Sequence, residues 1–482
     1  MKRDGLSIAR ERMSRVDTAW LRMDNDANLM MIVGVWLLRP AVAYEAVCAR
    51  VEAKLLQYER FRQKVVLDAT GADWVHDPDF DLHRHVLREH LVRQPRERER
   101  AALQRRTGEL AATPLDPERA LWQFHLIEDY DGGSALIARI HHCIGDGIAL
   151  TSVMLRITDG GTDPPRRRPR STAAAGGLAD SVMRPLGELS AKALALYDAS
   201  LARTLGLLSH PQHGLAGTLD GVRAARQVLG DVAALALMPD DSATRLKGKP
   251  SGEKRVAWSE PVPLERVKWI GKGLGCSIND VLLACVAGAL GAYLRDAGDD
   301  PRAKEIRAMV PVNLRPLDEA WQLGNRFGLA PLVLPIGLDN PVERVFAVRA
   351  RMTGLKTSYQ PLLAFVVLAV AGLMVKPLQD MILGLFSKKA TAVMTNVPGP
   401  AVPLTLCGST LRQTMFWVPA SGDIGVGVSI LSYAGGVQFG LITDAALCPD
   451  PQAVIDRFEP EFEKLLWLTL MLPWGADADT GT

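Results

Sequence analysis

The stretch SALIARIHHCIGDGIALTSVMLRI, from Ser134 to Ile157, decides the fold class of this chain. Its first part, Ser134–His142, is apolar and bounded by turn residues, which is typical of a buried β-strand. Its last part, from Gly147, carries apolar residues at helical spacing. Between them lies the heptad HHCIGDG, which places two histidines at the end of the strand. The stretch predicts a strand, a tight turn and a helix, the unit from which α/β domains are built.

The two histidines carry acid–base chemistry near neutral pH. A neutral imidazole with a pKa of about 6.5 can take a proton from an alcohol. Because adjacent strand residues point to opposite faces, His141 and His142 are not expected to share one proton or one metal ion. We expect one ring to face a cavity and the other to pack. Asp146 could orient the imidazole, or it could hold the loop through a buried ion pair with an arginine. Gly145 and Gly147 are expected to permit the turn.

Similar patterns continue on both sides of this stretch. The strand and helix signals lie at 30–38, 43–56, 278–298, 306–314, 425–430 and 436–442. They predict an α/β body over residues 1–160 and a second one over 256–474. Residues 161–255 separate the two bodies and contain a Pro/Arg-rich linker, an Ala/Leu-rich helical connector and a polar hinge at 247–255. The tail, 475–482, is expected to be disordered.

The composition narrows the class of protein. A length of 482 residues predicts about two to three domains. Hydrophobic residues make up 48% and charged residues 23%, as in soluble globular proteins. A formal net charge of +2 does not indicate a nucleic-acid partner. Six scattered cysteines form no CxxC pair, which indicates neither a zinc ribbon nor a disulfide framework and favours a reducing compartment. The N-terminus has no apolar core of signal-peptide length, so we expect a cytoplasmic protein.

A set of histidines, a set of arginines and one apolar stretch each allow more than one interpretation. The histidines at 76, 83, 85 and 90 fit no strong zinc signature, and we expect no metal. The arginines at 166–168 and 170 favour a solvated linker over a site for CoA phosphates or lipid headgroups. The stretch 361–386 begins with fifteen uncharged residues, fewer than the roughly 20 needed to span a bilayer. It is either a buried core helix or a peripheral membrane contact with Lys376, Lys388 and Lys389 near headgroups.

The heptad resembles the HHxxxDG active-site motif of the chloramphenicol acetyltransferase-like superfamily, which includes carnitine acyltransferases and nonribosomal-peptide condensation domains. The resemblance implies that His142 is the general base and that His141 supports it. It also implies that Asp146 is mainly structural and pairs with an arginine, for which Arg315 in VPVNLRP is the candidate. Gly147 completes the motif.

Further segments resemble landmarks of the wax ester synthase/diacylglycerol acyltransferase family, and together they cover nearly the whole chain. They are SRVDTAWL (14–21), WVHDPDFDLHRHV (74–86), PLDPERALW (114–122), CSINDVLLA (276–284), VPVNLR (310–315), LGNRFG (323–328) and TNVPGP (395–400). The chain departs from the family by having ALW for PLW, Thr395 for serine, about a dozen extra N-terminal residues and an extended linker. The resemblance implies two chloramphenicol acetyltransferase-like domains with mixed sheets flanked by helices, joined by a helical connector, with an active-site tunnel at their interface.

Two of these landmarks allow a reading from the residues themselves. Ser277 to Asp280 forms the S-x-x-D pattern of a capping box. Asn279 would lie in the first helical turn, where it could donate a hydrogen bond to an oxyanion or orient the reactants. Asn396 belongs to a rigid turn that Pro398 and its neighbours fix, and it could support the loop beside the tunnel.

The family resemblance implies transfer of a fatty acyl group from acyl-CoA to a diacylglycerol or a long-chain alcohol. No GxSxG elbow is present, which favours direct transfer without an acyl-enzyme. Acyl-CoA is then a substrate, and no further cofactor or nucleic acid is implied. Peripheral contact with a membrane or lipid droplet would bring the protein to its substrates. The alternatives are a condensation-like acyltransferase that uses carrier-bound thioesters, and a noncatalytic lipid-binding protein.

Overall fold

The computed structural model describes residues 10–68, 71–161, 238–315, 322–356 and 387–471, together with Ala364, Gln379 and Gly384. The predicted linker and helical connector lie outside the described residues up to position 237. The arginines at 166–168 and 170, most of the stretch 361–386 and the tail 475–482 also lie outside them.

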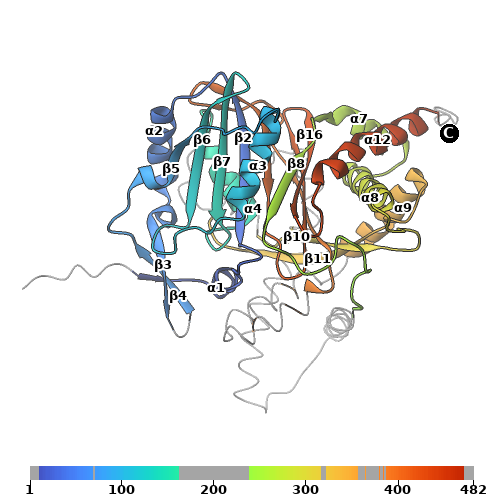
Figure 1. Cartoon of the computed structure of the whole chain (residues 1–482), viewed down its shortest axis with the longest axis horizontal. Helices are drawn as coiled ribbons and strands as arrows, with labels where there is room; N and C mark the ends of the chain where they lie inside the picture. Colours follow the sequence, from blue (N-terminus) through green and yellow to red (C-terminus); the bar gives the residue numbers. More distant parts are fainter. Residues whose placement is uncertain are drawn as a thin grey trace, which may run out of the picture.

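The first body is built on a six-stranded sheet in the order β13-β14-β2-β7-β6-β5. Its strands are β2 (Met31–Arg39), β5 (Val86–Glu89), β6 (Trp122–Tyr130), β7 (Gly133–His141), β13 (Thr405–Leu406) and β14 (Ser409–Trp417). Its helices are α1 (Arg15–Arg22), α2 (Tyr44–Lys54), α3 (Glu99–Ala111) and α4 (Gly147–Ile157), with short 3-10 helices at Leu55–Gln57, Glu59–Arg62 and Leu82–Arg84. A small sheet of β1 (Arg10–Arg12), β3 (Gln63–Asp68) and β4 (Gly71–His76) lies at one end of this body (Figure 1).

Alternating side chains of β2 cover both faces of this sheet. Trp36 and Leu38 belong to a core cluster that also contains residues of α2 and α4. Val33 and Val35 point to the other face and pack in a cluster with Leu103 of α3. This period of two is the strand geometry that places one residue set on each side of a sheet.

The second body is a mixed sheet in the order β11-β10-β12-β15-β16-β8, with β9 also paired to β16. Its strands are β8 (Lys254–Trp258), β9 (Val262–Pro263), β10 (Ile306–Asn313), β11 (Phe327–Leu334), β12 (Ala392–Pro398), β15 (Val426–Tyr433) and β16 (Gly436–Asp444). Its helices are α7 (Leu264–Gly273), α8 (Ile278–Asp296), α9 (Pro341–Lys356) and α12 (Pro451–Leu470), which lie together on one side of the sheet (Figure 1). The parallel pairs are β10 with β12 and β12 with β15.

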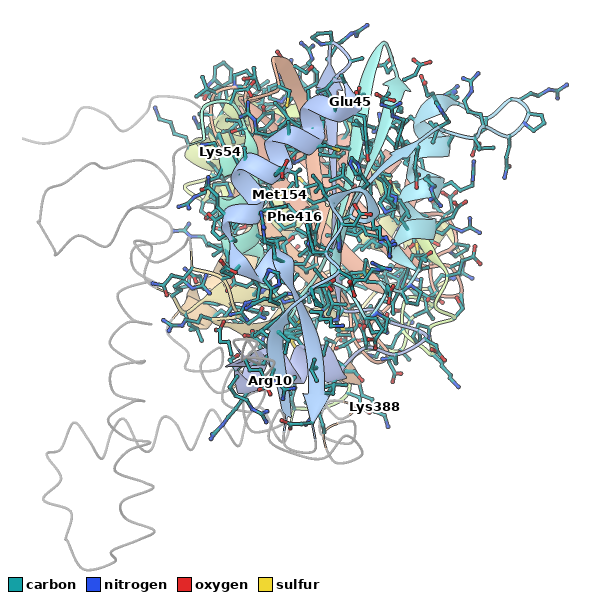
Figure 2. The ribbon with its side chains drawn as sticks, turned by 90° about the vertical axis from the view of Figure 1, so that its left-hand side faces the viewer. Arg10, Glu45, Lys54, Met154, Lys388 and Phe416 are labelled. Carbon is teal, nitrogen blue, oxygen red and sulfur yellow. The ribbon has the colours of Figure 1, made fainter. Side chains whose placement is uncertain are left out.

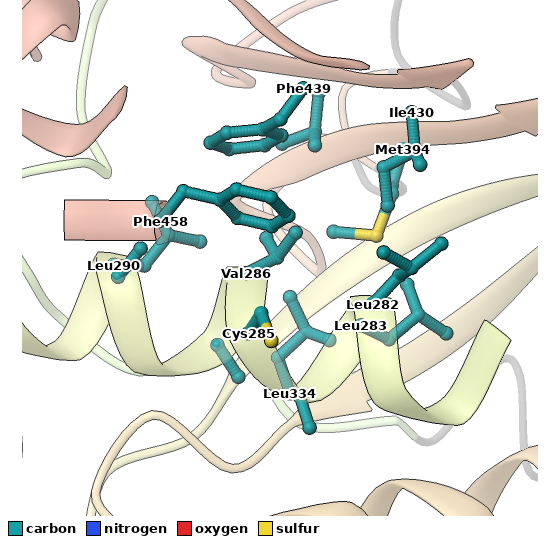
Figure 3. Close-up of a cluster of buried hydrophobic side chains, with 14 of the residues drawn as sticks. Leu282, Leu283, Cys285, Val286, Leu290, Leu334, Met394, Ile430, Phe439 and Phe458 are labelled. Atoms are coloured by element: carbon teal, nitrogen blue, oxygen red, sulfur yellow. The ribbon is translucent and has the colours of Figure 1, made fainter. Parts of the chain in front are cut away.

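Helix α8 forms the centre of the second core. Its side chains, including Leu282, Val286 and Leu290, face Phe439 of β16 and Phe458 of α12 (Figure 3). It is the one helix of the described residues that is long and apolar enough to cross a membrane, but 78% of its apolar window is buried inside the body. Its length and hydropathy are therefore explained by packing.

The predicted helices and strands are confirmed, with ends that shift by a few residues at most. The division at 255/256 does not match the structure, because that point falls inside β8. Nor do all residues after it belong to the second body. Strand β14 pairs antiparallel with β2, from Thr410 opposite Arg39 to Trp417 opposite Val33. The second half of the chain therefore completes the sheet of the first half.

Candidate active site

The HHxxxDG loop connects β7 to α4 at the boundary between the two bodies. The backbone N–H of His142 donates to the carbonyl oxygen of Met30 at 2.7 Å. The loop ends at Asp146, whose Oδ1 caps α4 by accepting the N–H of Ala149 at 2.9 Å. Neither Gly145 nor Gly147, the glycines expected to permit the turn, has a positive φ.

A glycine from the second body provides the unusual backbone conformation instead. Gly324 has a φ of 101°, which favours glycine, and it forms a parallel bridge with Gly145. Its N–H donates to the carbonyl oxygen of Ile144 at 3.0 Å. The loop of the first body is thus held by a backbone contact with residues just before β11.

Asp146 holds this junction together. Its Oδ2 lies 3.2 Å from Nη2 of Arg315 and accepts the N–H of Arg326 at 3.0 Å. Both side chains of the ion pair are at most 5% exposed. Arg315 Nη2 also donates to the carbonyl oxygen of Gly324 at 2.7 Å. The predicted contact between Asp146 and Arg315 is present, and of the two predicted roles the contacts support loop anchoring rather than orientation of the imidazole.

The His142 ring lies between two aromatic side chains. It stacks on Trp20 with ring centroids 4.2 Å apart and planes 13° apart, and Phe327 lies 5.4 Å away. Burial lowers the pKa of His142 to about 3, against smaller opposing effects of its own carbonyl group and of Asn325. Burial therefore favours the neutral form of the ring. The Nδ1 atom of His142 is buried and has no hydrogen-bond partner among the described residues.

His141 turns away from His142 toward the loop before β2. Its Nε2 lies 3.3 Å from Oδ2 of Asp24, and its Nδ1 accepts the N–H of Cys143 at 3.1 Å. Burial lowers the pKa of His141, but Cys143 and Asp24 raise it, and the net shift is upward. Both histidines are 2% exposed, and neither of them is in the lining of the apolar pocket described below.

Asn325 connects this loop to α1. Its Nδ2 donates to the carbonyl oxygen of His142 at 2.7 Å and to Oδ1 of Asp17 at 2.7 Å, and its N–H donates to the same Oδ1. Burial raises the pKa of Asp17, against the lowering effect of its bonds to Ser14 and Asn325. Sequence reasoning missed Asn325, Asp17 and Trp20 as site residues, although all three lie in segments that resemble family landmarks.

An apolar pocket adjoins the loop. It contains about 740 Å³ of space between atoms, a figure that includes its opening to solvent, and its walls are mostly apolar. Its lining includes Ile140 and Gly147, the residues on either side of His141–Asp146. Met154 of α4 and Phe416 of β14, both labelled in Figure 2, are among its lining residues. The pocket thus lies where the crossing strand meets the first body.

Asn279 and Asn396, predicted from separate landmarks, are in contact. The Nδ2 group of Asn396 donates to Oδ1 of Asn279. The predicted capping box is confirmed: Ser277 Oγ accepts the N–H of Asp280, and the Asp280 carboxylate accepts the N–H of Ser277. This box fixes the first turn of α8 and hence the position of Asn279.

Comparisons with known proteins identify the family. Residues 13–282 match the sequence model of the wax ester synthase/diacylglycerol acyltransferase catalytic domain. The chain belongs to this family. Residues 323–466 match the C-terminal domain of the same family. The wax ester synthase/diacylglycerol acyltransferase family comprises acyltransferases, and this chain is an enzyme of that type.

Relatives and solved structures are similar to this chain over most of its length. A probable diacylglycerol O-acyltransferase of Mycobacterium tuberculosis is 27% identical over 468 residues, covering 94% of this chain and 95% of the relative. A putative one from the same species is 31% identical over 399 residues, covering 81% and 83%. The wax ester synthase/diacylglycerol acyltransferase of Marinobacter aquaeolei VT8 has the same fold, with a TM-score of 0.65, 21% identity and coverage of 96% and 100%. A condensation domain of the calcium-dependent antibiotic synthetase has a TM-score of 0.57 and 16% identity, and the match covers 96% of this chain and 97% of that domain.

Two of the described histidines outside the motif, His83 and His85, have structural surroundings. His85 stacks on Trp122 at 4.7 Å and its Nδ1 contacts the carbonyl oxygen of the same residue. His83 contacts the hydroxyl group of Tyr44. Over the described parts of this family member, no group of three or more His, Cys, Asp or Glu side chains is arranged to hold a metal ion.

Proposed function

We propose that this protein transfers a fatty acyl group from acyl-CoA to a diacylglycerol or a long-chain alcohol, with His142 as the general base. The products are triacylglycerol or wax ester. The observation that carries the proposal is the position of the apolar pocket, whose lining includes the residues directly before and after the segment His141–Asp146. An acyl chain in this pocket would bring its thioester toward the loop that holds the imidazole.

The reaction needs one proton acceptor and no protein nucleophile. The neutral ring of His142 takes the hydroxyl proton while the acceptor oxygen attacks the thioester carbonyl carbon. The C–O bond forms, the C–S bond breaks, and the imidazolium returns the proton to the departing thiolate of CoA. General base catalysis of this kind contributes about 10²–10⁴ to a rate. Because the ring is 2% exposed, binding of the substrates must open a path to it.

Asn279 is the candidate donor to the oxyanion that forms on the carbonyl oxygen. Its Oδ1 is occupied by Asn396, which leaves its own amide hydrogens directed elsewhere. It also lies in the first turn of α8, at the positive end of the helix dipole. Loss of one such donor typically lowers turnover by about 10²–10³. We expect that loss for Asn279→Ala, measured as kcat with palmitoyl-CoA.

The decisive experiment measures thiol release from palmitoyl-CoA with hexadecanol and with dioleoylglycerol. His142→Gln should abolish release while the protein stays folded by circular dichroism. His85→Gln is the matched control, because this histidine is also buried and stacked on a tryptophan. Its variant should keep turnover close to wild type. Transfer that persists in His142→Gln would remove the base from the proposal.

The donor distinguishes this proposal from the alternatives. The fold is shared with condensation domains, so the same assay should include a palmitoyl thioester on an acyl carrier protein. Faster use of the carrier-bound donor would favour the condensation-like function. Lipid binding without any thiol release would favour a noncatalytic protein.

We infer that the enzyme works on the cytoplasmic side, in peripheral contact with a membrane or lipid droplet. Both acceptor classes are insoluble in water, and α12 ends in exposed apolar residues, with Trp467 63% and Met471 72% exposed. Tryptophan is favoured at membrane–water interfaces. Flotation with phosphatidylglycerol vesicles tests this, and Trp467→Ser should bind less. Wild-type protein that stays at the bottom of the gradient would contradict it.

A further inference from the structure

The stack between Trp20 and His142 is the closest ring contact of the catalytic loop. The two centroids are 4.2 Å apart with nearly parallel planes, so the indole face covers the imidazole. Trp20 is 5% exposed and His142 is 2% exposed, which excludes most water from the contact. A cation over an aromatic face within about 6 Å is attracted to it, most strongly over tryptophan and when desolvated.

The acidic residues near the ring all bind other groups. Asp146 binds Arg315 and two backbone N–H groups. Asp17 accepts from Asn325, and Asp24 faces His141. Within the described ranges, no carboxylate therefore contacts the His142 ring. An imidazolium formed there during proton transfer has an aromatic face beside it in place of a counter-ion.

Helix α1 is held firmly enough to present that face. Ser14 caps it by accepting the N–H of Asp17. The buried Gln379 donates from its Nε2 to the carbonyl oxygen of Ala19 at 3.0 Å. Asp17, one turn before Trp20, is joined through Asn325 to the carbonyl group of His142. One short helix thus fixes both the backbone and the ring of the same histidine.

We propose that Trp20 is a positioning residue for acyl transfer, holding the His142 ring and stabilising the positive charge that this ring gains when it takes the acceptor proton. The inference rests on the proposed role of His142 as the base. The stabilisation is greater in the transition state than in the ground state, because the charge is absent before proton transfer. Loss of the aromatic face should therefore lower kcat and leave KM nearly unchanged.

Three variants of Trp20 test this. Trp20→Leu and Trp20→Met should lower kcat for palmitoyl-CoA and hexadecanol by about 10- to 30-fold, with KM within about twofold of wild type. Trp20→Phe keeps an aromatic face and should recover most of the lost kcat. Trp258→Leu is the control for loss of a buried indole in a strand of the second body, and its kcat should stay near wild type. Circular dichroism and the thermal midpoint identify any variant that does not fold. If one of them does not fold, the comparison of kcat between Trp20→Met and Trp20→Phe tests the inference.

Each outcome supports or overturns the inference. Wild-type kcat in Trp20→Met would overturn it, as would a loss in Trp20→Phe as large as that in Trp20→Met. An equal loss in Trp258→Leu would also overturn it. If His142→Gln is inactive while Trp20→Met is fully active, only this inference fails. If His142→Gln keeps activity, the base is wrong and this inference falls with it.

Discussion

The change of Asp146 to asparagine separates a structural carboxylate from a catalytic one. Asparagine keeps an oxygen that can accept the N–H of Ala149 and cap α4. Its amide group would replace Oδ2, which now accepts the N–H of Arg326 and faces Arg315. The variant therefore places an amide N–H group against the N–H of Arg326 and removes the charge of Asp146 that faces the buried guanidinium of Arg315.

The expected cost follows from the burial of the pair. Removing one partner of a buried ion pair typically costs about 3–5 kcal/mol. Arg315 keeps its bond to the carbonyl oxygen of Gly324, so we expect Asp146→Asn to lie at the lower end, at about 3 kcal/mol. For a domain of 150–250 residues this corresponds to a fall in thermal midpoint of about 6–12 °C.

A double-mutant cycle provides the assay. Thermal midpoints of wild type, Asp146→Asn, Arg315→Met and the double variant should show that the double variant loses less than the sum of the singles, with a coupling of about 2–3 kcal/mol. The kcat of folded Asp146→Asn should fall by less than about 10-fold, because the carboxylate does not contact the His142 ring. When a carboxylate that orients a catalytic histidine is changed to asparagine, kcat falls by about 10⁴-fold. Additive midpoints, or a kcat loss near 10⁴, would refute the assignment.

Three further predictions concern pH, the pocket and the second core. Burial lowers the pKa of His142 to about 3, so protonation removes the base only below that pH. We therefore expect kcat/KM to show no fall centred near pH 6.5. A fall at that pH in the wild type that is absent from His142 variants would contradict this prediction. Met154→Trp should fill the pocket and lower kcat/KM for palmitoyl-CoA by about 10-fold relative to kcat/KM for hexanoyl-CoA. Equal losses of kcat/KM for the two acyl donors would argue against an acyl-binding site in this pocket. Gly288→Ala should lower the free energy of unfolding by about 2–4 kcal/mol, because a Cβ atom at this position would collide with the buried ion pair Arg344–Glu461. An unchanged thermal midpoint would disprove this.

Local signals predicted the individual elements well. The capping box of Ser277 and Asp280 and the apolar run after it determine where α8 begins and how it packs. The apolar runs of β2 and β7 can be recognised from neighbouring residues alone. Such features depend on contacts within a few positions, which a single sequence displays directly.

Long-range pairing was harder to predict. Strand β14 has the same kind of pattern as its neighbours, and nothing in that pattern indicates that it pairs with β2 in the other body. The contact of Arg315 with Asp146 was predicted only because a family motif implied an arginine. Asn325 meets His142 across the body boundary and Trp20 meets it from α1, and neither residue type indicates such a contact by itself.

The crossing of β14 has a consequence for how the gene can be divided. A fragment that ends at Gly161 would lack β13 and β14, and one long side of β2 would present unpaired backbone groups to solvent. Open edges of this kind recruit other chains and cause aggregation. Co-expression of the complementary piece would supply the missing strand in trans. This makes the molecule suited to split-reporter designs, in which reassembly of the two pieces restores turnover.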